Sequence, residues 1–244
     1  DNSSMSKINK LVLFDIDKTL IKSSKAHFEA FRVAFKKVYG IDAEVDTVNY
    51  DGMTDRQIII KVLKNKGLNE ADIRLRLQEC MAAMSNFFNQ AVSKEEIVPL
   101  GGVRELLEEL DKQDLIMGLV TGNVEQIARS KLKKAGIEGY FKVGGFGSDH
   151  ADRAQLIRIA VEEASQNFNF QNENTVFVFG DTPKDIRAAK ESGAKTIGVT
   201  TGIHNKEQLM EAGADIVLEN LKDKCRILEI LEIAISGVEK KNLK

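Results

Sequence analysis

The sequence predicts an α/β protein with a doubly wound parallel sheet and an inserted α-helical domain. The first observation is a series of short, uninterrupted apolar runs, which are typical of parallel strands buried on both faces. The second is that amphipathic helical patterns separate most of these runs, as they do in sheets covered by helices on both faces. The third is one long helical stretch after the first run. The predicted strands are residues 10–17, 115–121, 141–147, 175–180, 195–200 and 215–218.

The helices of the alternating part follow from their apolar positions. Residues 103–110 place three leucines on one helical face, which is the pattern of a helix packed against a sheet. Gly136 and Gly193 each follow a helical pattern, at the point where a residue in the left-handed conformation ends many helices. The other helices predicted in this part are residues 124–135, 153–164 and 184–191.

One long segment contains helical patterns but no convincing buried strand. It predicts helices over residues 26–39, 55–66 and 70–91. We interpret residues 22–98, called the helical insertion below, as a domain inserted into a core domain formed by residues 5–21 and 99–244. We take Met5 as a candidate natural start, which leaves the four residues before it outside the core domain.

Composition and charge narrow the class of protein. The 244 residues are 43% hydrophobic and 30% charged, which is typical of a globular protein. Lysine and arginine number 35 against 37 aspartates and glutamates, so the formal net charge of −2 provides no general attraction for nucleic acid or a membrane. No apolar run approaches the ~20 residues that span a bilayer. We expect a cytoplasmic monomer or dimer without nucleic-acid or membrane partners, in which Cys80 and Cys225 are buried thiols.

Carboxylates follow the first and fourth predicted strands. Asp15 and Asp17 are two residues apart in extended backbone, so their side chains point to the same side. Asp181 and Asp185 are one helical turn apart. The carboxyl ends of parallel strands lie at one edge of a sheet, which is where ligands bind. Crowded carboxylates repel one another, so this edge predicts a site for a hard divalent cation such as Mg²⁺.

Three motifs resemble those of the haloacid dehalogenase superfamily. Residues 14–20 (FDIDKTL), 119–123 (LVTGN) and 178–185 (VFGDTPKD) are similar, in this order, to motifs one, two and four of that superfamily. The segment VPLGGVRELL over residues 98–107 is similar as well, and the helical insertion resembles the cap that members carry between motifs one and two. The resemblance covers nearly the whole chain and points to the branch of phosphoglycolate phosphatases and β-phosphoglucomutases.

The resemblance implies roles for the carboxylates. Asp15 would be the nucleophile, which attacks phosphorus and forms an aspartyl-phosphate. Asp17 would first be the general acid that protonates the leaving oxygen and then the base that activates water. Mg²⁺ would be bound by Asp15, by the backbone carbonyl of Asp17 and by Asp181. Asp185 would support the site by orienting the cation of the third motif or a metal-bound water.

The resemblance also implies which residues hold the phosphoryl group. It places the Thr121 hydroxyl and the Gly122 amide around the phosphoryl oxygens, with Asn123 beside them. The third motif is a single cation, for which we choose Arg153, because it opens a predicted helix and can bind a phosphoryl group bidentately. Lys142 is the competing choice, although it lies before the end of its strand.

Asp17 separates phosphoryl transfer from dehalogenation. Dehalogenases of the superfamily lack a carboxylate at this position, because a halide leaving group needs no proton. An oxygen leaving group does need one, so Asp17 predicts a phosphatase that acts on phosphate monoesters with Mg²⁺ as cofactor. A β-phosphoglucomutase-like phosphomutase and a non-catalytic protein that binds a phosphate ligand on the same fold are the alternatives. A phosphonatase would need a lysine in the insertion that forms a Schiff base. Lys22 and Lys25 are available, but nothing in the sequence indicates that either is buried.

The helical insertion is expected to contribute to substrate binding. Residues 50–55 (YDGMTD) resemble the loop by which such caps reach the active site, so we expect Gly52 and Thr54 to contact the leaving group. Capping of the next helix by Thr54 or Asp55 is the competing interpretation. A cap of this kind closes over a small-molecule phosphate ester, and we favour phosphoglycolate-like acids or sugar phosphates as substrates.

Aromatic residues of the first inserted helix are expected to form the interior of the insertion. Phe28, Phe31 and Phe35 are spaced by three and four residues, which places them on one helical face. His27 precedes them, and we expect it to pack there as well, because a histidine on such a helix more often packs than binds a substrate.

Overall fold

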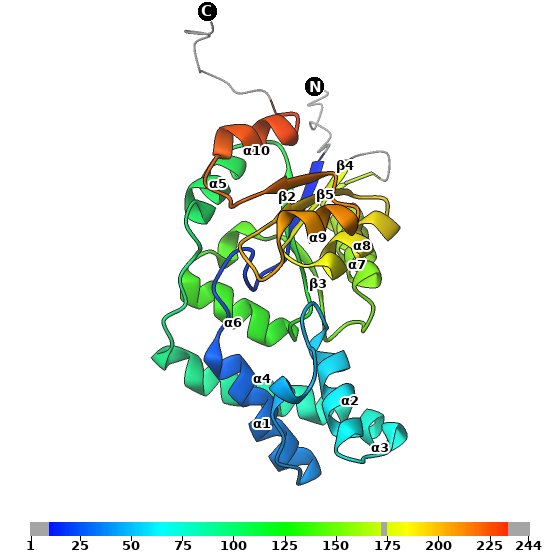
Figure 1. Cartoon of the computed structure of the whole chain (residues 1–244). Coiled ribbons are helices and arrows are strands. Elements are labelled where there is room, and N and C mark those ends of the chain that lie inside the picture. Colours follow the sequence, from blue (N-terminus) through cyan, green and yellow to red (C-terminus); the bar gives the residue numbers. More distant parts are fainter. Residues whose placement is uncertain (1–9, 172–174, 234–244) are drawn as a thin grey trace, which may run out of the picture.

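The protein is built around a six-stranded sheet in which all neighbouring strands are parallel (Figure 1). The computed structural model describes residues 10–171 and 175–233, so the candidate start at Met5 lies outside the described residues. The strand order is β3-β2-β1-β4-β5-β6. Every predicted strand is present, and the predicted fold class is confirmed. The strands are β1 (Lys10–Phe14), β2 (Ile116–Thr121), β3 (Val143–Phe146), β4 (Thr175–Gly180), β5 (Lys195–Val199) and β6 (Ile216–Leu218).

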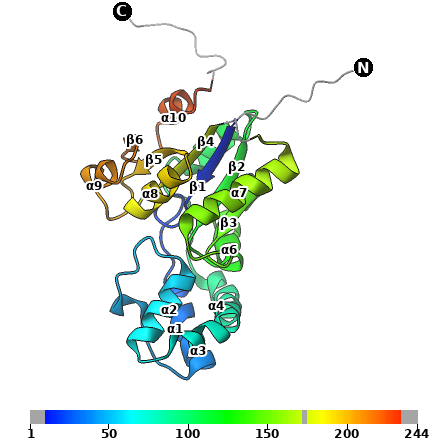
Figure 2. The ribbon, with the colours of Figure 1, turned by 90° about the vertical axis from the view of Figure 1, so that its right-hand side faces the viewer.

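Helices cover both faces of the sheet (Figure 2). They are α5 (Val103–Leu110), α6 (Glu125–Ala135), α7 (Arg153–Phe168), α8 (Pro183–Glu191), α9 (Lys206–Glu211) and α10 (Lys224–Ile230). Leu11 and Leu13 of β1 belong to one apolar cluster with α7 and α8. Val12 and Phe14 belong to another with α5, α6 and α10, because successive side chains of a strand point to opposite faces. Burial on both faces therefore accounts for the uninterrupted apolar run of this strand.

The carboxyl ends of β1, β2 and β4 lie side by side. β1 pairs with β2 on one edge and with β4 on the other, so Phe14 lies opposite both Leu119 and Phe179. The rings of Phe14 and Phe179 stack with their centroids 4.9 Å apart. This register brings Asp15, which follows β1, and Asp181, which follows β4, to the same edge of the sheet.

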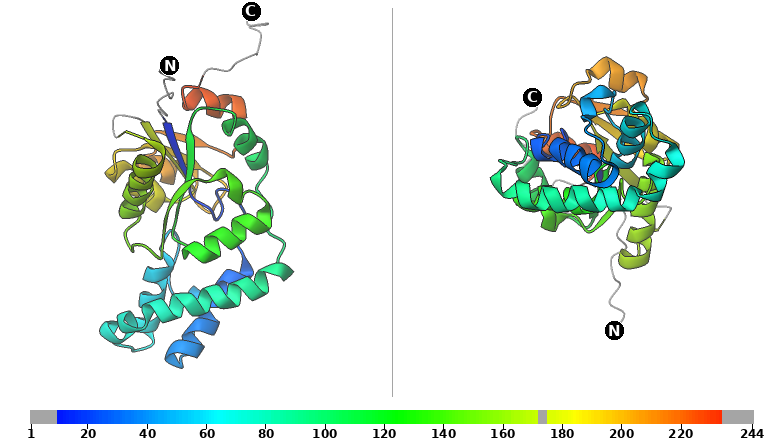
Figure 3. Two further views of the ribbon diagram at one scale, coloured as in Figure 1. Left: turned by 180° about the vertical axis from the view of Figure 1, so that it is seen from behind. Right: turned by 90° about the horizontal axis from the view of Figure 1, so that it is seen from below.

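The helical insertion, residues 22–98, folds into helices beyond this edge (Figures 1 and 3). They are α1 (Lys25–Tyr39), α2 (Asp55–Asn65), α3 (Glu70–Leu75) and α4 (Leu77–Ala91). The single helix predicted over residues 70–91 is wrong, because the backbone of Arg76, with φ −111° and ψ 13°, interrupts it between α3 and α4. The guanidinium of Arg76 binds the Glu79 carboxylate and the Val38 carbonyl of α1, which holds this break in place.

Two adjacent crossings join the helical insertion to the sheet. The Leu100 amide donates to the Leu20 carbonyl at 2.8 Å, and Ile21 forms an isolated bridge with Pro99. The apolar cluster that contains Phe14 continues from the sheet into α1, α2 and α4. The insertion is therefore held beside the carboxyl ends of the strands by packing as well as by its two connections.

The two cysteines differ in their exposure. Cys80 is buried in α4, as expected, but Cys225 is exposed, so the expectation of two buried thiols is wrong. Cys225 lies in α10, a helix that the sequence pattern did not predict and that buries Ile227 and Leu228 instead.

Within the described ranges, every helix is too short or too polar to cross a membrane.

Candidate active site

Three buried carboxylates meet at the carboxyl ends of β1 and β4. Asp15 follows β1, Asp181 follows β4, and Asp185 lies in the first turn of α8. One carboxylate oxygen from each lies within 4.8 Å of those of the other two. Asp185 is held by a capping box, in which its carboxylate accepts from the Thr182 amide at 3.0 Å and its own amide donates to the Thr182 hydroxyl at 3.2 Å. We call these three carboxylates the acid cluster.

Arg153 is the cation that the structure places in the acid cluster. It is the first residue of α7, and its Nη1 lies 3.2 Å from Asp15 and 2.7 Å from Asp185. Lys142, the competing choice, is exposed, and its ammonium donates to a backbone carbonyl before β3. Of the two cations, Arg153 alone lies within reach of a ligand bound beside Asp15.

The acid cluster carries more negative charge than Arg153 balances. Burial, followed by repulsion from Asp185, raises the pKa of Asp15 well above its ordinary value of 3.8. The same two causes raise the pKa of Asp181 to about 8. Oδ2 of Asp181 is buried and has no hydrogen-bond partner among the described residues. A hard divalent cation would relieve the repulsion among these carboxylates, and carboxylate oxygens are the ligands that such a cation prefers, so the residues present fit Mg²⁺.

A cavity of about 230 Å³ lies between the strand ends and the helical insertion. Its lining includes the acid cluster, Arg153 and Asp17 on the side of the sheet, and Phe28 and Tyr50 on the side of the insertion. Phe31 and Phe35 are buried as expected, but Phe28 is 38% exposed and its ring lies 5.3 Å from that of Tyr50. The volume is below the roughly 300–1,000 Å³ of pockets for drug-sized ligands, which favours a small substrate.

The turn after β2 lies against the loop before α2. Gly122 and Asn123 line the cavity, whereas Thr121 is fully buried and its hydroxyl accepts from the Asn123 amide at 3.2 Å. A Cβ on Gly122 would lie 2.6 Å from the Met53 carbonyl oxygen, so the close approach of the two segments requires glycine. The predicted residues of this turn therefore lie beside the acid cluster, with Thr121 behind Gly122 and Asn123.

Gly52 and Thr54 have different surroundings. Gly52 lines the cavity with a φ of 64°, and a Cβ there would lie 2.8 Å from the Thr182 hydroxyl. Thr54 is buried outside the cavity lining, caps α2 in a capping box with Gln57, and donates its hydroxyl to the Ala151 carbonyl. The structure brings Gly52 to the expected place and gives Thr54 the capping role that was the competing interpretation.

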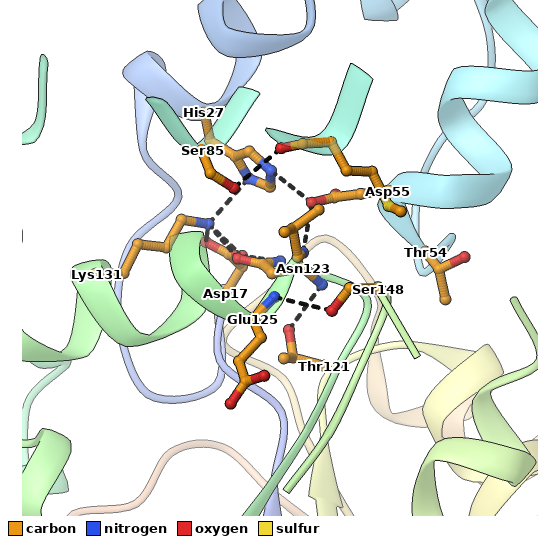
Figure 4. A network of polar contacts seen from close by, with 12 residues as sticks. Asp17, His27, Thr54, Asp55, Ser85, Thr121, Asn123, Glu125, Lys131 and Ser148 are labelled. Carbon is orange, nitrogen blue, oxygen red and sulfur yellow. Dashed lines mark hydrogen bonds and ion pairs between the residues drawn. The ribbon is translucent and has the colours of Figure 1, made fainter. Parts of the chain in front are cut away.

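Asp17 belongs to a separate polar network that the sequence analysis missed (Figure 4). The ammonium of Lys131, on α6, lies 2.8 and 2.7 Å from the two carboxylate oxygens of Asp17. Asn123 donates to Asp17 at 2.9 Å and accepts from Lys131 at 2.7 Å. The side chain of Lys131 is 0% exposed. Burial raises the pKa of Asp17, but Lys131, His27 and Asn123 more than offset it, so this pKa lies below its ordinary value.

The network continues into the helical insertion through His27 (Figure 4). Nδ1 of His27 lies 3.0 Å from the Lys131 ammonium, and Nε2 lies 2.9 Å from Asp55. Asp55 also accepts from the Val124 amide at 2.8 Å, just before α6. His27 stacks on Phe31 as well, so the expectation that it packs in the insertion describes only part of its contacts. We call Asp17, Asn123, Lys131, His27 and Asp55 the lysine network.

Comparison with known families identifies the chain. Residues 12–199 match a family model described as haloacid dehalogenase-like hydrolase. This span includes the last three residues of β1, all of β2 to β5, the helical insertion, the acid cluster and the lysine network. The chain belongs to this family. The match confirms the resemblance found in its three motifs.

Known relatives of this haloacid dehalogenase-like hydrolase include two curated proteins with different names. A phosphoglycolate phosphatase from Pseudomonas fluorescens is 28% identical over 230 residues, which cover 88% of this chain and 78% of the relative. Pyrophosphatase PpaX from Listeria monocytogenes is 26% identical over 214 residues, which cover 87% of this chain and 93% of that relative. The crystal structure of a predicted phosphatase from Clostridium acetobutylicum superposes with a TM-score of 0.68, over 91% of this chain and 99% of that one. Its sequence identity is 21%, so this match supports the fold alone.

Proposed function

We propose that this protein is an Mg²⁺-dependent phosphatase that hydrolyses a small phosphorylated metabolite through an aspartyl-phosphate on Asp15. The observation that carries the proposal is the position of Asp15 in a buried cluster with Asp181, Asp185 and Arg153. Asp17 lies two residues further on and faces the same cavity. The names of the two curated relatives, a phosphoglycolate phosphatase and a pyrophosphatase, agree with this class of reaction.

Asp15 is the nucleophile in this proposal. One of its carboxylate oxygens attacks phosphorus, and the bond between phosphorus and the leaving oxygen breaks. The guanidinium of Arg153, which reaches Asp15 at 3.2 Å, would hold a phosphoryl oxygen of the substrate. The Gly122 amide would hold another, and the contact between the Thr121 hydroxyl and the Asn123 amide orients this turn.

Asp17 is the acid in the first step and the base in the second. Its lowered pKa and its ion pair with Lys131 favour the ionised form. The ionised form suits the second step, in which Asp17 takes a proton from the water that attacks the aspartyl-phosphate. In the first step Asp17 gives a proton to the leaving oxygen, and this requires the ion pair with Lys131 to open.

The carboxylates of Asp15 and Asp181 and the backbone carbonyl of Asp17 would hold Mg²⁺. When bound, the metal supplies the positive charge that lets an anionic substrate approach an anionic nucleophile. Asp185 takes a supporting role in this proposal, because its oxygens are engaged by Arg153 at 2.7 Å and by the Thr182 amide at 3.0 Å. It thereby orients the guanidinium toward the site.

We also propose that the helical insertion, residues 22–98, is a cap domain over a core of residues 5–21 and 99–244. Contacts between the two support this position of the cap: the Asp55 amide donates to the Gly122 carbonyl at 2.7 Å, and Arg56 donates to the Ser148 carbonyl at 2.6 Å. These contacts lie at the edge of the sheet where the cavity lies. In this position the cap limits the access of water to Asp15.

A screen of phosphate esters tests the proposal. We expect Mg²⁺-dependent release of phosphate from p-nitrophenyl phosphate or from at least one phosphorylated metabolite, and no release of halide from haloacids. Asp15→Asn removes the nucleophile and should lower turnover at least about a thousandfold while the protein stays folded. Turnover of none of the esters, or full activity in Asp15→Asn, would contradict the proposal. Production of an isomeric sugar phosphate would favour the phosphomutase alternative, and binding of phosphate without turnover would favour the non-catalytic one.

A further inference from the structure

The cavity has two chemically different walls. The wall at the strand ends carries the acid cluster and Arg153. The wall formed by the helical insertion carries four side chains that we call the apolar wall, namely Phe28, Tyr50, Met53 and Ile58, and the rings of Phe28 and Tyr50 meet edge to face. Polar side chains of the insertion lie beside them: Ser23, Ser24, His27, Asp51 and Asp55. A phosphate ester whose phosphorus lies beside Asp15 must direct its leaving group away from the strand ends. The leaving group therefore faces the apolar wall of the insertion.

The basic side chains at the cavity already have carboxylate partners. Among the described residues that line it, they are Lys18, His27 and Arg153, and their shortest distances to a carboxylate oxygen are 3.4, 2.9 and 2.7 Å. Carboxylates outnumber them on the same lining: Asp15, Asp17, Asp51, Asp55, Asp181 and Asp185. Once Mg²⁺ and Arg153 have bound the phosphoryl group, the described lining offers no unpaired cation to a second anionic group.

We infer that the substrate's leaving group is an uncharged hydroxy compound, such as an alcohol, a phenol or a sugar, and not a carboxylate or a second phosphate. This inference rests on the proposed phosphatase function and restricts its substrate class. An anionic leaving group would lose hydration against Phe28 and Tyr50. No free cation of the described lining would compensate for this loss, because Lys18 and His27 are already paired with Asp51 and Asp55. An uncharged ring or hydrocarbon face packs on the two aromatic rings without this cost.

The inference narrows the substrates expected from the sequence. Of phosphoglycolate-like acids and sugar phosphates, it retains the sugar phosphates and removes the acids. It also separates this chain from the compounds for which its two curated relatives are named, phosphoglycolate and pyrophosphate. In this chain the restriction comes from the residues of the insertion, because the acid cluster on the other wall serves any phosphate ester.

Matched pairs of esters test the inference. Phenyl phosphate is compared with 4-carboxyphenyl phosphate, and 2-hydroxyethyl phosphate with 2-phosphoglycolate, by kcat/KM in the presence of Mg²⁺. We expect the uncharged ester of each pair to be preferred at least about tenfold, and pyrophosphate to be a poorer substrate than either uncharged ester. The carboxylate makes the phenol a better leaving group, so the chemistry alone would favour the charged ester of the aromatic pair.

A substitution on the apolar wall sharpens the test. Phe28→Lys places a cation there, and Phe28 is 38% exposed, so the substitution leaves the core packing intact. We expect Phe28→Lys to reduce the preference for phenyl phosphate about tenfold, mainly by lowering KM for 4-carboxyphenyl phosphate. The matched apolar variant Phe28→Leu should keep the ratio within about threefold of the wild type.

The outcomes separate this inference from the function on which it rests. If the charged esters are turned over as well as the uncharged ones, or if Phe28→Lys leaves the ratio unchanged, the inference is wrong and the phosphatase proposal stands. If none of the esters is turned over with Mg²⁺, the phosphatase proposal fails and the inference fails with it.

Discussion

Asp15 and Asp17 are two residues apart, yet they lie in opposite electrostatic surroundings. Asp15 shares the acid cluster with two other carboxylates and one guanidinium. Asp17 faces the Lys131 ammonium and the Asn123 amide in the lysine network. The pKa of Asp15 is therefore raised, chiefly by burial, whereas the pKa of Asp17 is lowered because Lys131 and its neighbours outweigh burial.

The difference shows two ways of keeping charge in a buried site. The acid cluster is incomplete without added positive charge, which suits a site that a metal and an anionic substrate enter and leave. The lysine network has its cation within the protein, and it connects the segment after β1 with α6 and, through His27, with the helical insertion. We therefore expect pH and metal to act mainly on the acid cluster, and side-chain replacement to act mainly on the lysine network.

The largest effect that we expect is the pH dependence of stability without metal. The pKa of Asp181 is raised from 3.8 to about 8, chiefly by burial and by Asp185, so the folded state keeps a proton that the unfolded chain releases. The stability that this proton contributes is complete below the ordinary pKa and is lost as the pH rises through about 8. Asp15 acts in the same direction. In EDTA, the free energy of unfolding in urea should fall by on the order of 3–5 kcal/mol between about pH 5 and pH 9.

Two changes should reduce this loss. Mg²⁺ stabilises the ionised carboxylates and should flatten the profile. Asp181→Asn should make the profile shallower without metal, and the part of the loss that comes from Asp15 should remain. The lowered pKa of Asp17 acts in the opposite direction, because the stability that it contributes is present above its ordinary pKa and is lost as the pH falls through its folded pKa. Unfolding in acid should therefore persist in Asp181→Asn. Equal stability of the metal-free wild type at pH 6 and pH 9 would contradict the account of the acid cluster.

Replacement of Lys131 should have the next largest effect. Lys131→Met leaves the Asp17 carboxylate and the Asn123 carbonyl oxygen without their buried donor, so the free energy of unfolding should fall by about 3 kcal/mol. Urea denaturation at pH 7 without metal measures it. Lys133→Met is the matched control, because Lys133 lies on the exposed face of the same helix, and it should change stability by less than about 0.5 kcal/mol. Equal effects of the two substitutions would show that the buried ion pair adds nothing to stability.

The strands and the acid cluster could be predicted because each signal lies within one short segment of the sequence. An uninterrupted apolar run followed by a carboxylate specifies a buried strand and its carboxyl end, and parallel pairing then brings Asp15 and Asp181 together. The break at Arg76 was missed because its cause, the contact with the Val38 carbonyl, lies on another helix.

The lysine network was missed because its partners are far apart in the sequence. Lys131 lies 114 residues from Asp17 and next to two exposed lysines, Lys133 and Lys134, so this part of α6 resembled a solvated face. One signal was present. Lys131 occurs four residues after Ile127 and one before Leu132, on the face of α6 that is buried. A lysine in phase with an apolar face predicts a buried ammonium, and a buried ammonium needs a carboxylate partner.

The smallest effect that we expect comes from His27, which joins the lysine network to the helical insertion. His27→Gln removes one contact each from Lys131 and Asp55, but Lys131 keeps Asp17 and Asn123, so the free energy of unfolding should fall by only about 1 kcal/mol. His150→Gln is the control, because His150 is exposed, and the hydrogen bond that its Nδ1 accepts from the Asp152 amide can also be accepted by the glutamine side-chain oxygen. This substitution should change stability by less than about 0.5 kcal/mol.

The comparison between His27→Gln and Lys131→Met decides how the lysine network is built. A cost for His27→Gln close to that of Lys131→Met would mean that the ammonium is held as much by the insertion as by Asp17, and that the network is one unit across both parts of the chain. A small loss of stability in His27→Gln combined with a large fall in its kcat would lead to a different conclusion. The ion pair would then be complete without the insertion, and the contact of His27 with Lys131 would serve to open that pair when Asp17 must receive a proton.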